Sequence, residues 1–217
     1  MARESHIQLP ADRDAIRELR VGDIVYLSGP LCTLRDMGHR RAVDALARGD
    51  NLPFDLAGSA LWHSGPITRR DGDRWHLVSA GPTTSSRFTP LGAELIRRLG
   101  ISVVVGKGTM GPEAVEAMKE VGGCFLNATG GCAVLYAHQV EEVVAVHWLD
   151  LGEPEAAWMV RARDMGPLVV GIDSTGDSLF DRMRAAMAPR LAEAYRRAGI
   201  TPGERLAYLP KRVPARG

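Results

Sequence analysis

Residues 89–127 read TPLGAELIRRLGISVVVGKGTMGPEAVEAMKEVGGCFLN, and they set the fold class of the chain. Residues 89–100 have helical composition and lead into SVVVG at 102–106, an uninterrupted apolar run typical of buried parallel strands. Pro112 opens a second predicted helix, because the N–H that proline lacks is not needed at the first helical position. CFLN, at 124–127, is predicted to be a short strand. Helices that alternate with buried strands predict an α/β domain.

The segment before this stretch begins with further predicted elements. DIVYLSG, at 23–29, is predicted to be a strand that the Gly29-Pro30 turn ends. TLRDMGHRRAVDALARG, at 33–49, has helical composition, and Gly49 is suited to end the helix.

Strand-like patterns lie on both sides of the central stretch. Asp71-Gly72 separates residues 60–70 from residues 74–81 and favours the turn of a β-hairpin. Three more strands are predicted toward the C-terminus: VVAVHWLDL at 143–151, AAWMVRA at 156–162 and PLVVGIDS at 167–174. With these strands we expect a mixed sheet.

The C-terminal part differs from the rest. Residues 178–199 are helical in composition and amphipathic, and Pro189 should break or kink that helix. We therefore divide the chain into a domain at 1–180 and a helical extension with a basic tail at 181–217.

Composition limits the classes of function. The 217 residues include 27 Lys and Arg against 26 Asp and Glu, a net charge of +1, so bulk charge favours neither nucleic acid nor an anionic membrane as partner. No apolar run approaches the ~20 residues of a membrane-spanning helix, and the first residues lack a secretory signal. We expect a cytoplasmic protein.

The three cysteines, Cys32, Cys124 and Cys132, lie 92 and then 8 positions apart, and no CxxC pair occurs. Three thiolates are enough for an iron–sulfur cluster with one open iron, but such ligands usually include two cysteines a few residues apart. We interpret these cysteines as apolar core residues.

Two segments combine cations with turn or cap signals. Arg35, in TLRDMGH at 33–39, stands near a helix start where a carboxylate would be held, although on this segment alone an exposed pair with Asp36 is the favoured interpretation. GPTTSSRF at 81–88 places four hydroxyls before Arg87. Capping explains one or two of these hydroxyls but not all four, so an anion-binding loop is favoured.

GKGTMG at 106–111 has the spacing of a dinucleotide-binding loop. That hypothesis requires an acidic residue about 20 positions onward, and none occurs between Glu120 and Glu141. The dinucleotide hypothesis thereby loses most of its support. A phosphate-binding P-loop does not fit, because Lys107 is followed by glycine rather than Ser or Thr. What remains is a lysine at the C-terminal end of a buried strand, where open α/β sheets bind ligands.

The other candidates are weaker. The glycine pair in ATGGCAV at 128–134 fits close packing better than an anion nest, and His63, His76 and His147 have no second ligand at metal spacing. The informative side chains suit a small dicarboxylate: Arg35, Arg87 and Lys107 as cations, and Thr83, Thr84, Ser85 and Ser86 as hydroxyls.

These segments resemble a known family from about Leu19 to Leu179. The motifs that carry the resemblance are TLRDMGHRR, GPTTSSRF, GKGTMGPE, GGCAVL, QVEEVVAVHWLDLGEPEAAW and PLVVGIDSTGDSL. They are similar to the β subunit, or C-terminal domain, of the iron–sulfur hydro-lyases that comprise class I fumarases and L(+)-tartrate dehydratases. The likeness to the tartrate dehydratase branch is the closer one.

The resemblance implies a swivelling β/β/α-type domain that works with a separate α subunit. In this family the three cysteines of the α subunit hold a 4Fe-4S cluster, whose open iron acts as a Lewis acid on the substrate hydroxyl and one carboxylate. The cofactor therefore belongs to the partner and not to this chain.

The resemblance also implies roles for single residues. Arg35, Arg87 and Lys107 would grip the substrate carboxylates, with Thr84 in the same substrate-binding set. Thr83 matches the residue that removes the proton next to a carboxylate. Asp36 and His39 would complete the catalytic set by orienting it. Two positions depart from the family pattern, Thr109 and Cys132, and neither removes a charge.

We therefore expect the β subunit of a hetero-oligomeric hydro-lyase that is active only with its α subunit. The preferred reaction is L(+)-tartrate to oxaloacetate, ahead of malate to fumarate. The alternatives are a fumarate hydratase β subunit and a non-catalytic module of the same fold for carboxylate binding or assembly. No nucleic acid or membrane partner is expected.

Overall fold

The computed structural model of the chain describes residues 2–57 and 59–200. The chain divides into two compact units, residues 1–180 and 181–217. Its elements, with η for 3-10 helices, are β1 Glu4–Gln8, α1 Arg13–Arg17, β2 Ile24–Thr33, α2 Asp36–Arg48, β3 Ala60–Trp62, β4 Ile67–Asp71, β5 Arg74–Ser79, η1 Ser85–Phe88, α3 Thr89–Leu99, β6 Val103–Gly106, α4 Pro112–Val121, β7 Cys124–Asn127, α5 Ala133–His138, β8 Val140–His147, η2 Leu149–Leu151, β9 Ala157–Ile172 and α6 Leu179–Arg197.

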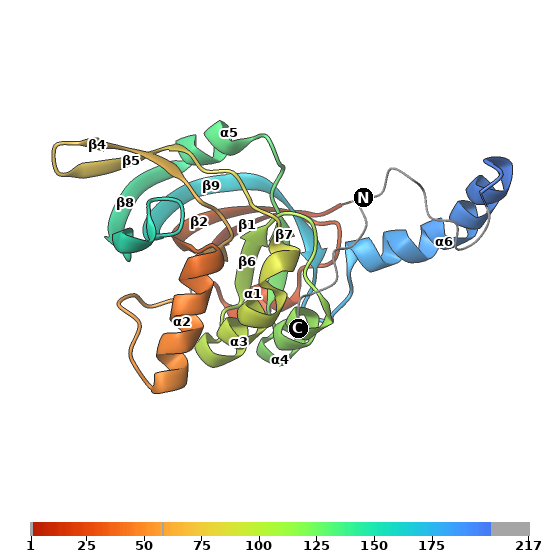
Figure 1. Ribbon diagram of the computed structural model, residues 1–217, viewed down its shortest axis with the longest axis horizontal. Coiled ribbons are helices and arrows are strands. Elements are labelled where there is room, and N and C mark those ends of the chain that lie inside the picture. Colours follow the sequence, from red (N-terminus) through yellow and green to blue (C-terminus); the bar gives the residue numbers. More distant parts are fainter. Residues whose placement is uncertain (1, 58, 201–217) are drawn as a thin grey trace. The chain divides into compact units, whose positions relative to one another are not determined.

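Five strands of the first unit close into a ring (Figure 1). β2 pairs with β3, β3 with β6, β6 with β7 and β7 with β9, and β9 pairs back with β2. β9 is antiparallel to both of its ring neighbours, whereas the other ring pairs are parallel. β1 and β8 extend the sheet on β2 and β9. The predicted α/β domain with a mixed sheet is confirmed.

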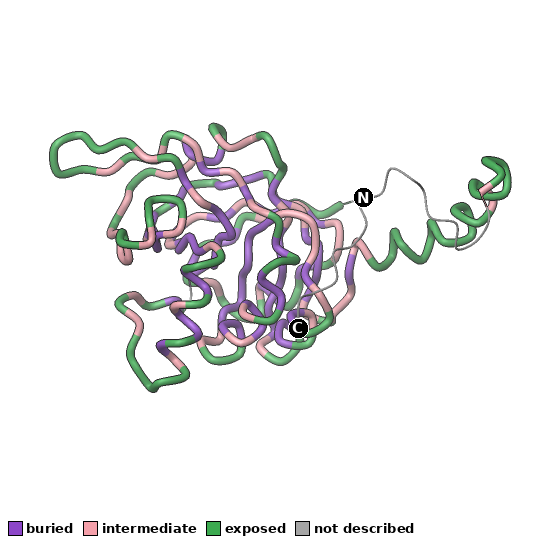
Figure 2. Tube along the Cα trace, in the orientation of Figure 1, coloured by how far each residue is buried: buried purple, intermediate pink, exposed green. Residues whose placement is uncertain are grey.

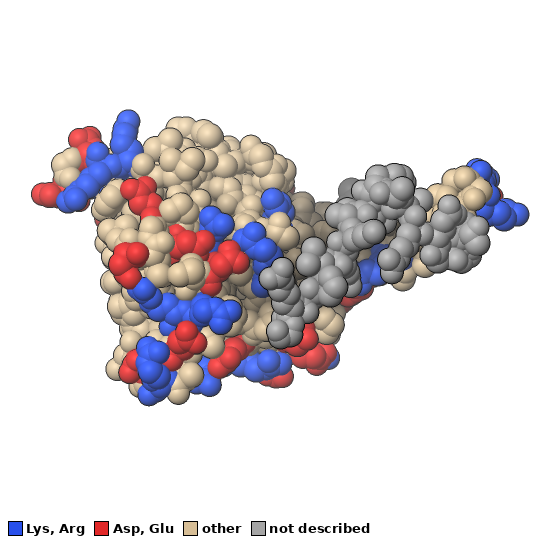
Figure 3. All heavy atoms as spheres, in the orientation of Figure 1, with Lys and Arg blue, Asp and Glu red and all other residues tan. Residues whose placement is uncertain are grey.

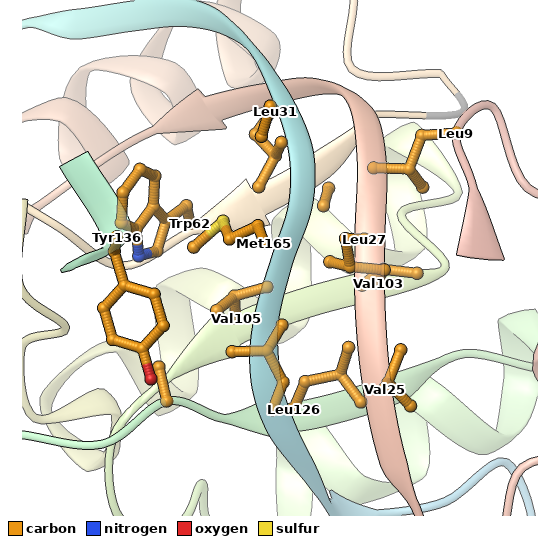
Figure 4. Packing of buried hydrophobic residues seen from close by; sticks show 14 of the residues in the cluster. Leu9, Val25, Leu27, Leu31, Trp62, Val103, Val105, Leu126, Tyr136 and Met165 are labelled. Atoms are coloured by element: carbon orange, nitrogen blue, oxygen red, sulfur yellow. The ribbon is translucent and has the colours of Figure 1, made fainter. Parts of the chain in front are cut away.

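Side chains of the ring strands alternate between two apolar clusters. In β6, Val103 and Val105 belong to the first cluster and Val104 belongs to the second. Figure 4 shows the first cluster gathered between the strands, with Trp62 and Leu126 among its members. The second cluster includes residues of α2, α3 and α4, which lie together on one side of the sheet (Figure 1). SVVVG is apolar throughout because both of its faces are buried.

β3 and β6 are buried throughout, whereas β2 includes half-buried positions and β9 also includes exposed ones; the helices and the hairpin are partly exposed (Figure 2). β4 and β5 pair across Gly72 as the predicted hairpin, which forms a separate two-stranded sheet. The predicted end of α2 is also confirmed, because Gly49 caps it in the left-handed conformation with φ 81°.

Gly29-Pro30 does not end its strand as predicted, and a second Gly-Pro pair lies inside a strand that was predicted as two. β2 continues through Gly29-Pro30, where its neighbour on one side changes from β1 to β3. β9 is one strand of 16 residues where two were predicted, and Gly166-Pro167 lies where its neighbour changes from β8 to β7. A proline that cannot donate a ladder hydrogen bond is tolerated at such a change of partner.

In the second unit, α6 continues through Pro189 as one helix, so the proline does not break it. The other predicted outcome, a kink at this residue, stays a prediction. Beyond Phe180, four large apolar side chains of this helix recur every four residues, and all of them are exposed: Met183, Met187, Leu191 and Tyr195. The basic tail at 210–217 lies outside the described residues. Within the described ranges, no helix is long and apolar enough to cross a membrane.

Candidate active site

Four of the predicted site residues lie in one cluster at the surface. The Arg87 guanidinium donates from Nη2 to Asp36 Oδ2 at 2.9 Å and to Thr83 Oγ1 at 3.1 Å. Arg35 Nη2 lies 4.0 Å from the same Asp36 oxygen. Two guanidinium groups therefore share one carboxylate, beside a hydroxyl. The Asp36 and Arg87 side chains are 48% and 45% exposed, so the cluster opens to solvent.

Arg35 is held at the beginning of α2. It is the N-cap residue of that helix, and its own side chain caps no backbone N–H. Glu155 caps the helix instead, since its Oε2 accepts from the Met37 N–H at 2.8 Å. Its Oε1 lies 3.5 Å from Arg35 Nε. The N-terminus of α2, which carries partial positive charge, thus faces the cluster together with the two arginines.

The loop before η1 is fixed to the end of β3. The Thr83 N–H donates to the His63 carbonyl at 2.8 Å, and Ser64 Oγ donates to the Gly81 carbonyl at 2.9 Å. Arg87 then lies in η1 with its guanidinium 5.2 Å from the centre of the Phe88 ring. Thr83 and Arg87 are four residues apart in this tight turn, which brings their polar atoms together.

Lys107 follows β6 and joins the same loop through the backbone. The Ser85 N–H donates to the Lys107 carbonyl at 3.0 Å, and the Lys107 N–H donates to Ser85 Oγ at 3.1 Å. Thr84 forms a bridge with Lys107 and is exposed. The Lys107 side chain lies along Gly130, where a Cβ would be 3.2 Å from its Cδ.

His39 and His63 are fully buried beneath the cluster. His39 Nδ1 donates to the Arg35 carbonyl at 2.8 Å, and its ring stacks on Phe88 at 4.6 Å between centroids. Burial lowers the pKa of the His39 imidazole to about 4. The pKa of His63 lies well below its ordinary value, because burial, then repulsion from His39 when that ring is also protonated, and then the charge of Arg87 disfavour its protonated form. Both rings are neutral at pH 7.

The structure thus brings Arg35, Asp36, Thr83 and Arg87 into contact, while His39 supports Arg35 from below. Thr84 and Lys107 pair with each other through a backbone bridge, and the Lys107 ammonium extends toward the 128–131 loop. Sequence reasoning assigned no role to Glu155, and it treated His63 as structural. Glu155 lies 118 positions from Met37, so no local pattern could have linked them.

The cysteines do not fit an iron–sulfur cluster. Cys32 and Cys124 are buried, and burial raises the pKa of both thiols, that of Cys124 to about 12. A cluster requires thiolates, which such burial disfavours. In the described part of the chain no three His, Cys, Asp or Glu side chains are arranged to hold a metal ion.

Basic and acidic side chains are interspersed on the face of the first unit shown in Figure 3.

Comparisons with known proteins identify the family of this chain. Residues 2–183 match the family described as the fumarase C-terminus. The chain is 44% identical over 181 residues to the L(+)-tartrate dehydratase subunit beta of Escherichia coli K12, which covers 83% of this chain and 89% of the relative.

Two further relatives have diverged more. A protein of Methanocaldococcus jannaschii named "Putative L(+)-tartrate dehydratase subunit beta" is 41% identical over 82% of this chain and 92% of its own length. A Geobacillus stearothermophilus protein named "Putative fumarate hydratase class I" is 39% identical over 86% of this chain but only 35% of its own length. This chain is a member of the fumarase C-terminus family.

Proposed function

We propose that this chain is the β subunit of a hydro-lyase that removes water from a 2-hydroxydicarboxylate, with L(+)-tartrate preferred over malate. The observation that carries the proposal is the pair of guanidinium groups, Arg35 and Arg87, that share the Asp36 carboxylate beside Thr83 Oγ1. A carboxylate of the substrate would take the place that Asp36 holds between the two arginines. Guanidinium groups suit this task because they donate two parallel hydrogen bonds to a carboxylate.

In this proposal each residue has a defined task. Arg35, Arg87 and Lys107 bind the carboxylates, and Thr84 lies in the same site through its bridge to Lys107. Thr83 removes the proton from the carbon next to a carboxylate. The Arg87 hydrogen bond to Thr83 Oγ1 favours the charged form of that hydroxyl, and the cations stabilise the negative charge that develops on the substrate. Asp36 orients the two arginines until a substrate carboxylate replaces it, and His39 holds the backbone of Arg35.

The rest of the site would come from a partner. We assign the 4Fe-4S cluster to an α subunit, since the described residues of this chain offer no site that fits one. The exposed cluster of charges would be covered when this domain swivels onto that subunit. The expected assembly is a cytoplasmic hetero-oligomer with α–β or β–β contacts. The relatives named as subunit beta support such a partner.

The test is anaerobic reconstitution of the chain with its α subunit, followed by assays on L(+)-tartrate and L-malate. We expect dehydration by the pair, a higher kcat/KM for tartrate, and no turnover by the chain alone. Robust turnover by the chain alone would refute the division between subunits. A higher kcat/KM for malate would mean that malate, and not tartrate, is the preferred substrate.

A fumarate hydratase β subunit is the second candidate. The 39% identity to the relative named as a class I fumarate hydratase favours it. A non-catalytic module would bind dicarboxylates or the α subunit yet give an inactive pair with every diacid, which the same assay would reveal.

A further inference from the structure

Two buried imidazoles beneath the site each leave one nitrogen without a partner. His39 Nε2 and His63 Nε2 are both inaccessible to solvent and accept or donate no hydrogen bond. The ring centroids lie 5.1 Å apart. Buried polar atoms without partners are costly, so this pair calls for an explanation.

The partner of His39 determines which of its nitrogens carries the proton. His39 Nδ1 lies 2.8 Å from the Arg35 carbonyl, which can only accept. Nδ1 must therefore carry the proton. In the neutral ring Nε2 is then a bare acceptor.

Ser85 determines the proton position on His63 in the same way. Ser85 Oγ accepts from the Lys107 N–H at 3.1 Å and lies 2.9 Å from His63 Nδ1. Among the described residues, His63 Nδ1 is the one acceptor within hydrogen-bond reach of the Ser85 hydroxyl, so we assign the hydroxyl proton to that bond. The neutral His63 ring then carries its proton on Nε2, which is a donor.

The unpartnered acceptor and the unpartnered donor thus complement one another. A hydrogen bond of about 2.9 Å between two ring nitrogens, plus the two ring radii, matches a centroid separation near the one observed. We propose that His63 Nε2–H donates to His39 Nε2, which completes a buried chain of hydrogen bonds from the Lys107 N–H through Ser85, His63 and His39 to the Arg35 carbonyl. The bond is not formed in the structure, so it requires the two Nε2 atoms to turn toward one another.

This buried chain of hydrogen bonds would position the residues at its two ends. At one end it holds the backbone of Arg35, at the other that of Lys107, and these are two of the three cations assigned to the substrate carboxylates. Phe88 keeps both rings in place, with centroids 4.6 Å from His39 and 4.7 Å from His63. His63 and Ser85 are therefore positioning residues, which fix the distance between the two ends of the diacid site. The kinetic consequence rests on the proposed function, whereas the hydrogen bonds do not.

The first experiment needs no substrate. In the full-length chain labelled with 15N-histidine, NMR should show a protonated Nδ1 on His39, a protonated Nε2 on His63, and a scalar coupling between the two Nε2 nitrogens. Ser85→Ala should abolish the coupling, and Ser85→Thr should restore it. A protonated His39 Nε2, or no coupling in the unaltered chain, would overturn the proposal.

The second experiment measures the effect on the site in the reconstituted pair. His63→Phe and Ser85→Ala should raise the KM for the diacid roughly tenfold, the loss expected for one hydrogen bond, with a smaller change in kcat. Ser85→Thr should recover the KM, and His76→Gln, an exposed histidine on the hairpin, should leave it unchanged. A fall in kcat at constant KM would indicate loss of folded enzyme and would overturn the positioning role.

The two experiments separate the two proposals. If the unaltered pair turns over no diacid, the proposed function fails. The NMR result still decides whether the buried hydrogen bonds between Ser85, His63 and His39 exist.

Discussion

The Arg87 guanidinium lies 2.9 Å from Asp36, a residue 51 positions earlier in the chain. An ion pair this exposed contributes little to stability, about 0–1 kcal/mol. Asp36 can therefore yield its place on Arg87 to a substrate carboxylate at small cost. The pair connects η1 to the beginning of α2, so exchange of the carboxylate would be felt by both loops of the site.

Replacing Arg87 by alanine should cut kcat/KM of the reconstituted pair by about 10²-fold or more. Each charge-assisted hydrogen bond contributes about 1.5–3 kcal/mol, and the variant loses the two that a bidentate contact makes to the substrate carboxylate. Steady-state kinetics with tartrate measures this. Arg98→Ala is the matched control, since Arg98 is 46% exposed and also carries an ion pair, with Glu94, away from the site. Equal kinetics for both variants would remove Arg87 from the site.

Thr83→Val should lower kcat by about 10²–10⁴-fold, the range for a lost general base. Binding of the diacid should change little, because the arginines remain. Thr83→Ser keeps the hydroxyl and should retain most of the activity, and Ser86→Ala, an exposed hydroxyl on the same loop, should behave like the unaltered chain. If Thr83→Val kept its kcat, another group would have to remove the proton.

Local patterns predicted those parts of the fold that depend on neighbouring residues. The apolar run at 102–106 and the glycine after α2 were read correctly, because burial on both faces and a left-handed cap leave direct traces in sequence. Gly29-Pro30 was misread as a turn. β2 continues through this dipeptide because its neighbour changes there from β1 to β3. No residue near Gly29 indicates that change in the sequence.

The candidate site shows the same division. The sequence pointed to Arg35, Thr83 and Arg87 as unusual cations and hydroxyls. It did not indicate that two of these cations would share Asp36. Glu155, which caps α2 from 118 positions away, has no local signal. Contacts between distant segments depend on how the ring of strands closes, and that closure is a property of the whole unit.

Gly106→Ala should destabilise the first unit more than Gly108→Ala. A Cβ at position 106 would overlap Ser85 Oγ and lie 3.1 Å from His63 Nδ1, whereas position 108 is open and strained only by its φ of 79°. Overpacking of this kind costs about 1–3 kcal/mol. Urea unfolding of the two variants gives the difference, and equal losses would show that the loop yields without disturbing Ser85.

Residues 1–180 should fold when 181–217 are removed. Both apolar clusters consist of residues from the first unit, and no residue of α6 is buried. The truncated chain should show a cooperative transition with a Tm within a few degrees of the full chain. Loss of that transition would mean that the C-terminal unit belongs to the same folding unit as the ring.

The stability of the full chain should fall as pH drops below about 6.5, in part because of His39. Burial lowers the pKa of this imidazole to about 4 in the folded chain, and in the unfolded chain it is about 6.5. Between these values the unfolded state binds a proton that the folded state does not, so stability rises with pH by about 1.4 kcal/mol per pH unit for this residue. Above pH 6.5 this imidazole is neutral in both states and its contribution is constant.

His39→Asn keeps a donor for the Arg35 carbonyl and removes the titration. The slope of the unfolding free energy between pH 5 and 6 should therefore be smaller by the amount that one bound proton contributes, although the variant is less stable throughout. Urea unfolding at each pH measures the slope, and an unchanged slope would mean that His39 is protonated in the folded chain.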